Sequence, residues 1–572
     1  MGVPGFFMWL MKQYKNKKIV FPKSKASQDD PINSIDYLLI DMNCMIHPEC
    51  FKTLDGIKTN VVEEIEAKMR NNVIAYLERI IEHNMPRKGV YLAIDGVAPV
   101  AKMKQQRLRR FKSINDKELY ENLRKKHNKE NPVYWSNSAI TPGTNFMRLL
   151  NSRIVEWATT WSKKHKLEIL YSSCNVPAEG EHKLLQFIRN NKESYSYSIY
   201  GLDADLIFLA LSTGLDSIYL MREGQILRED TQEAVEGFNY VSIKILKECI
   251  VDTMKKRFNK EVEYTIILDN NKLVDDFIFI CYLMGNDFLP HLPSLDIYNG
   301  AIDTLIEKYV DTLREYPSQY IVIREPGNCN IDTDIFYNFL SRLATDEEAT
   351  LKLSYGKKKY SSQCISTDPY DIEVHRIENM KFKINDPIQL GKDNMTDWRK
   401  RYYNYYYKLE ENDIDNHCMN MVYHYMIGLK WITCYYFDKC PAWNWFYPYD
   451  NPPFLQDMVR YKKDFTEIQF KLGEPMTPFE QLLTVLPRQS AYLLPQSLQK
   501  IMLNKKGSAN HLYPTRFELD MIGKKKYWMV SPILPPLEIK LIRGMFNKYS
   551  QHLSSDLREM NLNKTSYIKF SY

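Results

Sequence analysis

The sequence lacks the cysteine patterns and apolar runs that define several protein classes. Its ten cysteines include no C-x-x-C pair and follow no repeating spacing, which argues against a zinc ribbon or a disulfide scaffold. No apolar run approaches the roughly 18 residues of a membrane span. The apolar N-terminal segment is too short and too early for a secretory signal, and Phe6 stands where a myristoylation signal has Ser or Thr. We therefore expect a soluble intracellular protein.

A strong excess of one charge is also missing. The net charge is +6 over 572 residues, so a nucleic-acid partner is permitted without being required, and the positions of the cations matter more than their sum. There is no internal repeat and no low-complexity tract. With 44% hydrophobic and 26% charged residues, the composition is typical of a folded protein with about two to four domains.

The first part of the chain alternates short β-like runs with longer helical patterns. The candidate strands are residues 37–40, 90–94, 167–171, 197–200 and 217–220. Helical patterns cover residues 61–83 and 180–191. Strands separated by helices predict an α/β fold with a mostly parallel, twisted sheet and helices on both faces. Ligands of such sheets bind beyond the carboxyl ends of the strands.

The pattern changes in the second half of the chain. Residues 351–398 show little helical or alternating pattern, which is typical of a linker or an irregular inter-domain segment. The part that follows is rich in Tyr and Trp. We therefore predict a first region at residues 1–345, a variable segment at 346–395 and an aromatic-rich, largely helical second region at 396–572.

Acidic residues stand where the candidate strands and a later apolar run end. One such residue is more often a helix N-cap or a turn residue than a functional group. Several are harder to explain in this way, because the carboxyl ends of parallel strands meet at one edge of a sheet. The seven acids are Asp41, Asp95, Glu179, Glu181, Asp203, Asp205 and Asp287.

Carboxylates gathered at one edge predict a metal site. They repel one another and raise one another's pKa unless cations neutralise them. Their hard oxygen ligands suit Mg²⁺ or Mn²⁺, and about seven acids are enough for two such ions. Two neighbouring ions can activate a water on one side of a phosphate and stabilise the leaving oxygen on the other. The sequence therefore predicts phosphodiester hydrolysis, with the seven acids as metal ligands and catalytic residues.

A basic segment, VAKMKQQRLRRF at residues 100–111, follows closely after Asp95. If this segment is helical, four polar residues share one of its faces: Lys102, Gln106, Arg109 and Arg110. A solvated helix face explains the pattern as well as a phosphate site does. The nearness of Asp95 favours the phosphate site, since the donors of Arg and Lys suit a terminal phosphate.

Long motifs, in order along the chain, resemble the Xrn family of 5′→3′ exoribonucleases. In the first region these are MGVPGFFMWL, LLIDMNCMIHPE, IDGVAPVAKMKQQRLRRF, VPAEGEHK, YGLDADLI and DDFIFICYLMGNDFLPHLPSLDI. In the second region they are WRKRYY, AWNWFYPYDNPPF, PFEQLLTVLP and YPTRFELD. The resemblance covers nearly the whole chain and implies a PIN/FEN-like nuclease core.

The resemblance also implies roles for individual residues. The seven acids would form a two-metal centre. A 5′-monophosphate would be bound by Lys102, Gln106, Arg109 and Arg110. His47 would stack on the first base with a Trp of the second region, either Trp443 or Trp445, although core packing explains most aromatics there. The family usually has Gly at Cys44 and a basic residue at Val100, and neither position is a ligand.

These observations predict a processive, metal-dependent 5′→3′ exoribonuclease that degrades single-stranded RNA with a 5′-monophosphate to mononucleotides. The cofactor would be Mg²⁺ or Mn²⁺, as two ions. The long C-terminal extensions of larger family members and the zinc-knuckle cysteines of the nuclear paralogue are not seen. We therefore expect a minimal catalytic core, cytoplasmic rather than nuclear, without the usual partner-binding regions and with no membrane partner.

Two alternatives stay open at this point. A flap endonuclease acting on branched DNA shares the sheet and the acids, but it needs a glycine-rich helical hairpin after the last acid, and FLPHLPSLDI contains no glycine. An inactive RNA-binding scaffold would have lost metal ligands, and none of the seven acids is lost. No residue that we can name reads the 2′-hydroxyl that distinguishes RNA from DNA.

Overall fold

The computed structural model contains an eight-stranded sheet with the strand order β1-β7-β6-β5-β2-β3-β4-β12. The structure describes residues 5–15, 17–22, 31–191, 194–201, 203–227, 234–260, 266–325, 327–356 and 363–572. Five neighbouring strands run parallel: β6 Ile218–Leu227, β5 Tyr197–Tyr200, β2 Tyr37–Asp41, β3 Gly89–Ala93 and β4 Glu168–Ser172. These are the five strands that the sequence predicts, so the mostly parallel sheet is confirmed.

Alternate residues of the parallel strands face two separate helical layers. The layers contain α3 Val62–Asn84 and α5 Asn145–His165 on one face, and α6 Gly180–Asn190 and α7 Asp205–Ser212 on the other. In β2, Leu38 and Ile40 belong to the first core and Leu39 to the second. All three are fully buried, as expected for apolar strands covered on both faces. The predicted helices at 61–83 and 180–191 are α3 and α6.

Three antiparallel strands that the sequence patterns do not predict extend the two edges of the sheet. β7 (Ala234–Ser242) and β1 (Val20–Pro22) continue it beyond β6. At the other edge, β12 (Ile568–Phe570) pairs with β4, and Lys569 forms an ion pair with Glu168. The sheet of the first region is therefore completed by a strand from the C-terminal end of the second region.

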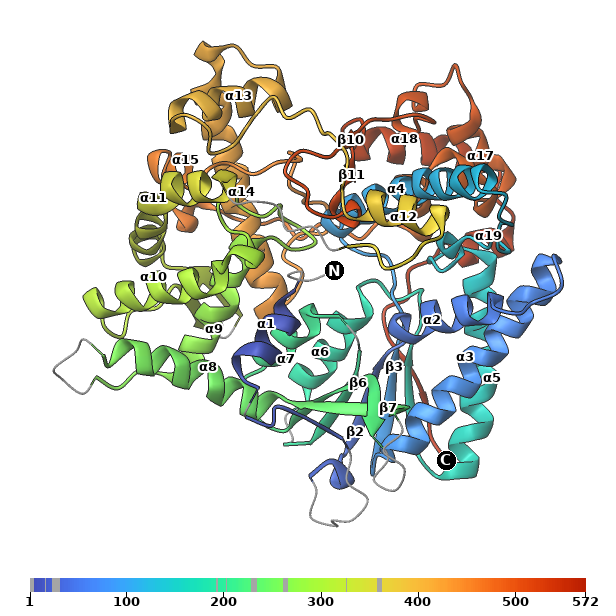
Figure 1. Ribbon diagram of the computed structural model, residues 1–572. Helices are drawn as coiled ribbons and strands as arrows, with labels where there is room; N and C mark the ends of the chain where they lie inside the picture. The colour runs from blue at the N-terminus through green and yellow to red at the C-terminus, as the bar shows by residue number, and fades with distance from the viewer. Residues whose placement is uncertain are drawn as a thin grey trace.

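The second region is largely helical, as the sequence predicts, and lies across the upper part of Figure 1 in orange and red. Its helices are α13 Met395–Tyr407, α14 Glu411–Phe437, α15 Leu455–Arg460, α16 Pro478–Val485, α17 Gln496–Leu503, α18 Ile539–Ser550 and α19 Ser555–Met560. One continuous core runs from Phe6 of the first region to Ile468 of the second. The two regions are thus packed into one body.

The segment at 346–395 has more regular structure than its sequence pattern indicates. α11 (Thr333–Gly356) crosses residue 345 and packs against α15, and α12 (Pro369–Glu378) lies inside the segment. Tertiary packing of Leu351, which is buried, extends α11 where the local pattern is weak. Among the described helices, none combines the length and the apolar character that crossing a membrane requires.

Candidate active site

The seven acids stand on elements that end at one edge of the sheet. Asp41 is the last residue of β2, and Asp95 follows the end of β3 by two residues. Glu179 and Glu181 stand at the start of α6 after β4. Asp203 lies between β5 and α7, and Asp205 is the first residue of α7.

Asp287 reaches the same edge by a different route. It follows a turn at Gly285, a few residues after α9 (Asn270–Cys281). Gly285 has a φ of +86°, and a Cβ added to it would lie 2.7 Å from the backbone nitrogen of His291. Only glycine satisfies both conditions without strain, so this turn depends on the glycine in the sequence MGND.

Electrostatic coupling shows that the seven acids form one cluster. Burial, and then the charges of Asp95 and Asp203, raise the pKa of Asp41 to about 8. Burial, followed by Asp287, raises the pKa of Asp205 to about 7. The pKa of Glu181 is well above its ordinary value for the same reasons, with Glu179, Asp205 and Asp41 as its carboxylate neighbours. The structure therefore brings all seven predicted acids together, and we call them the acidic cluster.

Gly180 allows Asp41 and Asp95 to lie close to each other. Its amide donates to Asp95 Oδ1 at 2.6 Å, and a Cβ added to Gly180 would lie 2.8 Å from Asp41 Oδ1. Asn43 connects the same two acids, because its amide donates to Asp41 Oδ1 at 3.1 Å and its Oδ1 accepts from the Asp95 amide at 3.0 Å. The sequence stretch VPAEGEHK thus needs a glycine between its two glutamates.

Lys102 contacts two acids of the acidic cluster, whereas the sequence predicts it as a phosphate-binding residue. It is on α4 (Val100–Lys126), and its Nζ donates to Asp287 Oδ2 at 2.6 Å and forms an ion pair with Glu179. Burial alone would lower the pKa of Lys102, but Asp287 and Glu179 raise it well above its ordinary value. Burial would likewise raise the pKa of Asp287, and the Lys102 ammonium holds it below its usual range.

The other three predicted phosphate-binding residues lie further along α4. Arg110 is partly buried, and its Nη2 donates to Thr141 Oγ1 at 2.7 Å. Its buried Nη1 has no hydrogen-bond partner among the described residues. Burial, and then the neighbouring charge of Arg109, lower the pKa of Arg110 to about 9. Gln106 is 9% exposed and accepts a long bond from Gln481 Nε2 at 3.5 Å.

His47, which the resemblance assigns to base stacking, lies beside this basic group. It is on α2 (Asn43–Leu54), and burial followed by the charges of Arg109 and Arg110 lowers its pKa to about 4. The imidazole is therefore neutral near pH 7, which suits stacking on a base rather than ion pairing. His47, Gln106, Arg109 and Arg110 form what we call the basic pocket.

The two candidate stacking tryptophans occupy different surroundings. Trp445 stacks on the buried Trp431 with 5.1 Å between ring centroids. The backbone carbonyl of Trp443 accepts from the Val100 amide at 2.9 Å, at the first residue of α4. Among the described residues, no ring contact joins His47 to either tryptophan. Both tryptophans therefore lie near elements of the site, and these contacts do not identify which of them stacks on a base.

The sequence does not predict four residues that lie at the acidic cluster. Lys183 Nζ donates to Ile94 O at 2.6 Å and to Ser173 O at 3.0 Å, which ties the ends of β3 and β4 together. Cys44 Sγ donates to Asp41 Oδ2 at 3.2 Å. Tyr435 and His182 also contact the cluster. Lys183 and His182 belong to VPAEGEHK, so the motif itself is a signal for them, whereas nothing in the sequence singles out Tyr435.

The acidic cluster fits a divalent metal ion. Glu179, Glu181 and His182 each offer one ligand atom, and these three atoms lie within 4.8 Å of one another. Burial, and then repulsion by neighbouring carboxylates, raise the pKa values of Asp41 and Asp205, and a bound divalent cation would relieve that repulsion. Carboxylate oxygens are suitable ligands for hard divalent cations.

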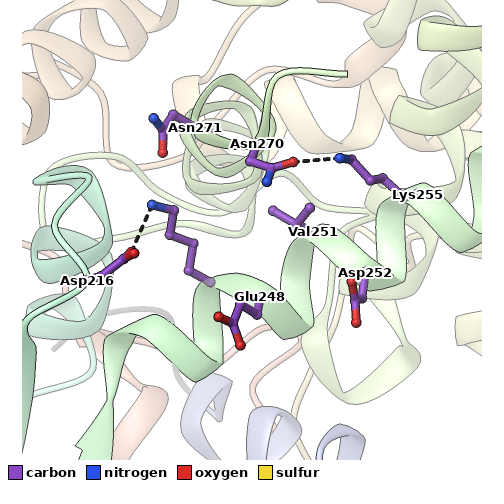
Figure 2. Close-up of a pocket in the computed structure, with 8 residues that line it drawn as sticks. Asp216, Glu248, Val251, Asp252, Lys255, Asn270 and Asn271 are labelled. Carbon is purple, nitrogen blue, oxygen red and sulfur yellow. Dashed lines mark hydrogen bonds and ion pairs between the residues drawn. The ribbon is translucent and has the colours of Figure 1, made fainter. Parts of the chain in front are cut away.

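A polar surface pocket of about 400 Å³ lies elsewhere, between α8 (Ile243–Phe258), α9 and the loop that contains Asp216 (Figure 2). Lys247 pairs with Asp216 there at 3.1 Å, and Lys255 Nζ donates to Asn270 Oδ1 at 2.6 Å. Its lining includes no member of the acidic cluster or the basic pocket, so it is separate from the candidate site.

Comparison with known families gives two matches along the chain. A family described as the XRN 5′-3′ exonuclease N-terminus matches residues 1–224. A family described as the Xrn1 helical domain matches residues 267–368 and 346–571. The helical-domain match begins well before residue 345, and our three-part division of the chain stays a prediction.

Curated relatives agree with these matches. The 5′-3′ exoribonuclease 2 of Candida albicans is 28% identical, over 100% of this chain and 74% of that protein. That of Arabidopsis thaliana is 29% identical, over 94% of this chain and 66% of the relative. The human 5′-3′ exoribonuclease 1 is 28% identical over 98% of this chain, which spans 35% of that protein. Since the two family matches cover most of the chain, it belongs to the Xrn family of 5′→3′ exonucleases.

Proposed function

We propose that this chain is a metal-dependent 5′→3′ exoribonuclease that removes mononucleotides from single-stranded RNA with a 5′-monophosphate. The observation that carries the proposal is the placement of two opposite electrostatic sites along one helix. At the start of α4, Lys102 contacts the acidic cluster. Two turns later, Arg110 keeps a buried donor without a partner among the described residues. A phosphate is the ligand that such a donor suits.

The acidic cluster is the proposed site of hydrolysis. Two Mg²⁺ or Mn²⁺ ions bound by its seven carboxylates would supply an activated water and stabilisation of the leaving oxygen. The chain's own part is to hold the carboxylates in place: Gly180 and Asn43 fix Asp41 and Asp95. Lys102 adds a positive charge next to Glu179 and Asp287, where negative charge develops on a cleaved phosphodiester.

The basic pocket is the proposed site of the 5′-monophosphate. From Lys102 to Arg110 the helix rises about 12 Å, so α4 fixes the separation between the terminal phosphate and the scissile bond. Hydrolysis leaves a new 5′-monophosphate on the shortened RNA, and the same pocket can accept it in the next cycle. A 5′ end that carries a cap or a triphosphate would have to place additional groups beside the buried Gln106 and the partly buried Arg110, so the proposed pocket would refuse it.

Base stacking is the proposed third contact. His47 lies beside Arg109 and Arg110, so a base attached to the bound phosphate would lie within its reach. Trp443 or Trp445 would support the opposite face of the base. Stacking accepts any base, which a processive nuclease requires. Residence in the cytoplasm rather than the nucleus stays a prediction of the sequence.

A substrate panel tests the proposal. The protein is incubated with Mg²⁺ and one RNA sequence that carries a 5′-monophosphate, a 5′-hydroxyl or a 5′-triphosphate, together with single-stranded and flap DNA. We expect stepwise release of mononucleotides from the 5′-monophosphate RNA alone, and its abolition by a chelator. An Asp203→Asn, Asp205→Asn double variant serves as the inactive control. Equal degradation of all RNA ends, internal cleavage, or preferred cutting of flap DNA would contradict the proposal.

A further inference from the structure

Tyr435 of α14 lies against the acidic cluster although it is neither an acid nor a predicted stacking residue. We propose that Tyr435 is a positioning residue that orients Glu179 for metal binding, an inference that rests on the function proposed above. It makes a residue of the second region part of the metal site. Its support comes from the hydroxyl contact, the packing of the ring and the chemistry of a buried phenol.

The hydroxyl contact fixes one oxygen of Glu179. Tyr435 Oη donates to Glu179 Oε1 at 2.8 Å, and Lys102 holds Oε2 of the same carboxylate. Glu179 is 4% exposed and Tyr435 is 2% exposed, so water does not compete readily for either oxygen. A carboxylate held by two defined donors keeps one orientation, and such outer contacts set the affinity of metal ligands.

The phenol is a suitable donor because it stays neutral. A neutral phenol can donate a hydrogen bond to the carboxylate without cancelling its charge. Lys102, by contrast, places a full positive charge beside the same carboxylate. Tyr435 therefore orients Glu179 while leaving its negative charge available.

The ring of Tyr435 is held by neighbours of two other acids. Its centroid lies 3.7 Å from that of His182, which follows Glu181, and 5.3 Å from that of Phe288, which follows Asp287. On another side it stacks on Trp431 at 4.6 Å. The ring thus cannot move without disturbing segments that carry the acidic cluster, so its hydroxyl is placed rigidly.

The stack also continues toward a candidate substrate contact. Trp431 stacks on Trp445 at 5.1 Å, so three rings in sequence join Trp445 to the carboxylate of Glu179. Trp431 is fully buried and donates its indole N–H to Ala442 O at 2.9 Å. Through this stack, the second region supports the metal site of the first.

The test compares Tyr435→Phe with Tyr403→Phe in the full chain. Tyr403 is a matched control because its buried hydroxyl also donates to a carboxylate, Asp457 Oδ2, at 2.7 Å, outside the acidic cluster. Binding of Mn²⁺ is measured by the electron paramagnetic resonance signal of the free ion. We expect Tyr435→Phe to raise the Kd for Mn²⁺ about 10-fold or more, and Tyr403→Phe to leave it unchanged.

Activity gives an independent readout. We expect Tyr435→Phe to raise the Mg²⁺ concentration for half-maximal rate by the same factor, with the KM for RNA unchanged and the rate recovered at excess Mg²⁺. A loss of structure would not be recovered by metal. In a double-mutant cycle, Glu179→Gln should abolish most of the effect of Tyr435→Phe, because the two residues act through one contact.

The outcomes distinguish the role of Tyr435 from the proposed nuclease function. Wild-type affinity for Mn²⁺ in Tyr435→Phe, or equal losses in Tyr435→Phe and Tyr403→Phe, would overturn the role of Tyr435 while leaving the proposed nuclease intact. If the wild-type protein bound no more Mn²⁺ than the Asp203→Asn, Asp205→Asn variant, both the role of Tyr435 and the proposed function would be contradicted.

Discussion

The thiol of Cys44 donates a hydrogen bond to Asp41, with 3.2 Å between Sγ and Oδ2. The family pattern that the sequence resembles usually has Gly at this position, so this chain adds a side chain next to a proposed metal ligand. Cys44 is partly exposed, whereas Cys50 and Cys174 are buried. A reagent that modifies this thiol would therefore place a group beside the acidic cluster.

Alkylation of Cys44 should inactivate the enzyme. A carbamidomethyl group on Sγ would occupy the space beside Asp41 and hinder metal binding, so we expect iodoacetamide to abolish RNA degradation and Mg²⁺ to slow the inactivation. Residual activity and the mass of the alkylated peptide are measured together. Cys44→Ser should resist the reagent and keep its activity. Inactivation of Cys44→Ser at the parental rate would assign the effect to another cysteine.

Replacing Arg110 should remove the preference for a 5′-monophosphate. Hydrogen bonds to a charged partner contribute about 1.5–3 kcal/mol, so Arg110→Met should lower kcat/KM for 5′-monophosphate RNA about 10- to 100-fold. Degradation of 5′-hydroxyl RNA, already slow, should change little. Because Arg110 has a buried donor without a described partner, the same variant should unfold at a temperature equal to or above that of the parent. A large fall in melting temperature would show that Arg110 stabilises the fold instead.

Gly180→Ala should disrupt the acidic cluster. The new Cβ would lie 2.8 Å from Asp41 Oδ1 and 3.3 Å from Asp95 Oδ1. Such overpacking costs about 1–3 kcal/mol and displaces both carboxylates, so we expect loss of Mn²⁺ binding and activity. Gly544→Ala is the matched control, since Gly544 is also in a helix and a Cβ there meets nothing within 4 Å. Thermal unfolding and activity of both variants are compared, and equal effects would count against the prediction.

Metal stabilisation should grow as the pH rises from about 5 to about 8. Asp41 and Asp205 have folded-state pKa values raised to about 8 and about 7. Between their ordinary values and these values, the metal-free folded protein holds protons that the unfolded chain releases, so its stability falls with rising pH. A bound metal ion removes this loss and stabilises the folded state. The difference in melting temperature with Mn²⁺ and with a chelator is measured across this range, and a difference independent of pH would contradict the coupling.

Measurements of KM for RNA and of melting temperature together identify the stacking tryptophan. Loss of a base stack costs about 1–3 kcal/mol, so the stacking residue, when changed to Ala, should raise KM for RNA whether or not the melting temperature changes. Trp445→Ala should also lower the melting temperature, because Trp445 packs on Trp431. A raised KM in Trp443→Ala alone would assign the role to Trp443. If neither variant raised KM, stacking by this pair would be refuted.

The sequence predicts the parts of the fold and site that depend on short segments. The five parallel strands are apolar runs bounded by turn residues, and each acid follows such a run, so both are visible locally. The edge strand β12 is not, because its pairing with β4 joins residues about 400 positions apart. The helical face of Lys102 predicts a phosphate contact, but its contacts with Glu179 and Asp287 depend on where α9 ends in space, which periodicity does not report. Tyr435 is one of many tyrosines, and only the packing of α14 distinguishes it.

The pairing of β12 with β4 has a consequence for how the protein is made. During synthesis the acidic residues emerge in the first half of the chain, long before residues 568–570 can close the edge of their sheet. The same holds for α14, which brings Tyr435 to Glu179. Contacts between such distant segments form slowly and late. A nascent chain on the ribosome therefore carries most of the acidic cluster before the segments that close the sheet edge and contact Glu179 have been synthesised.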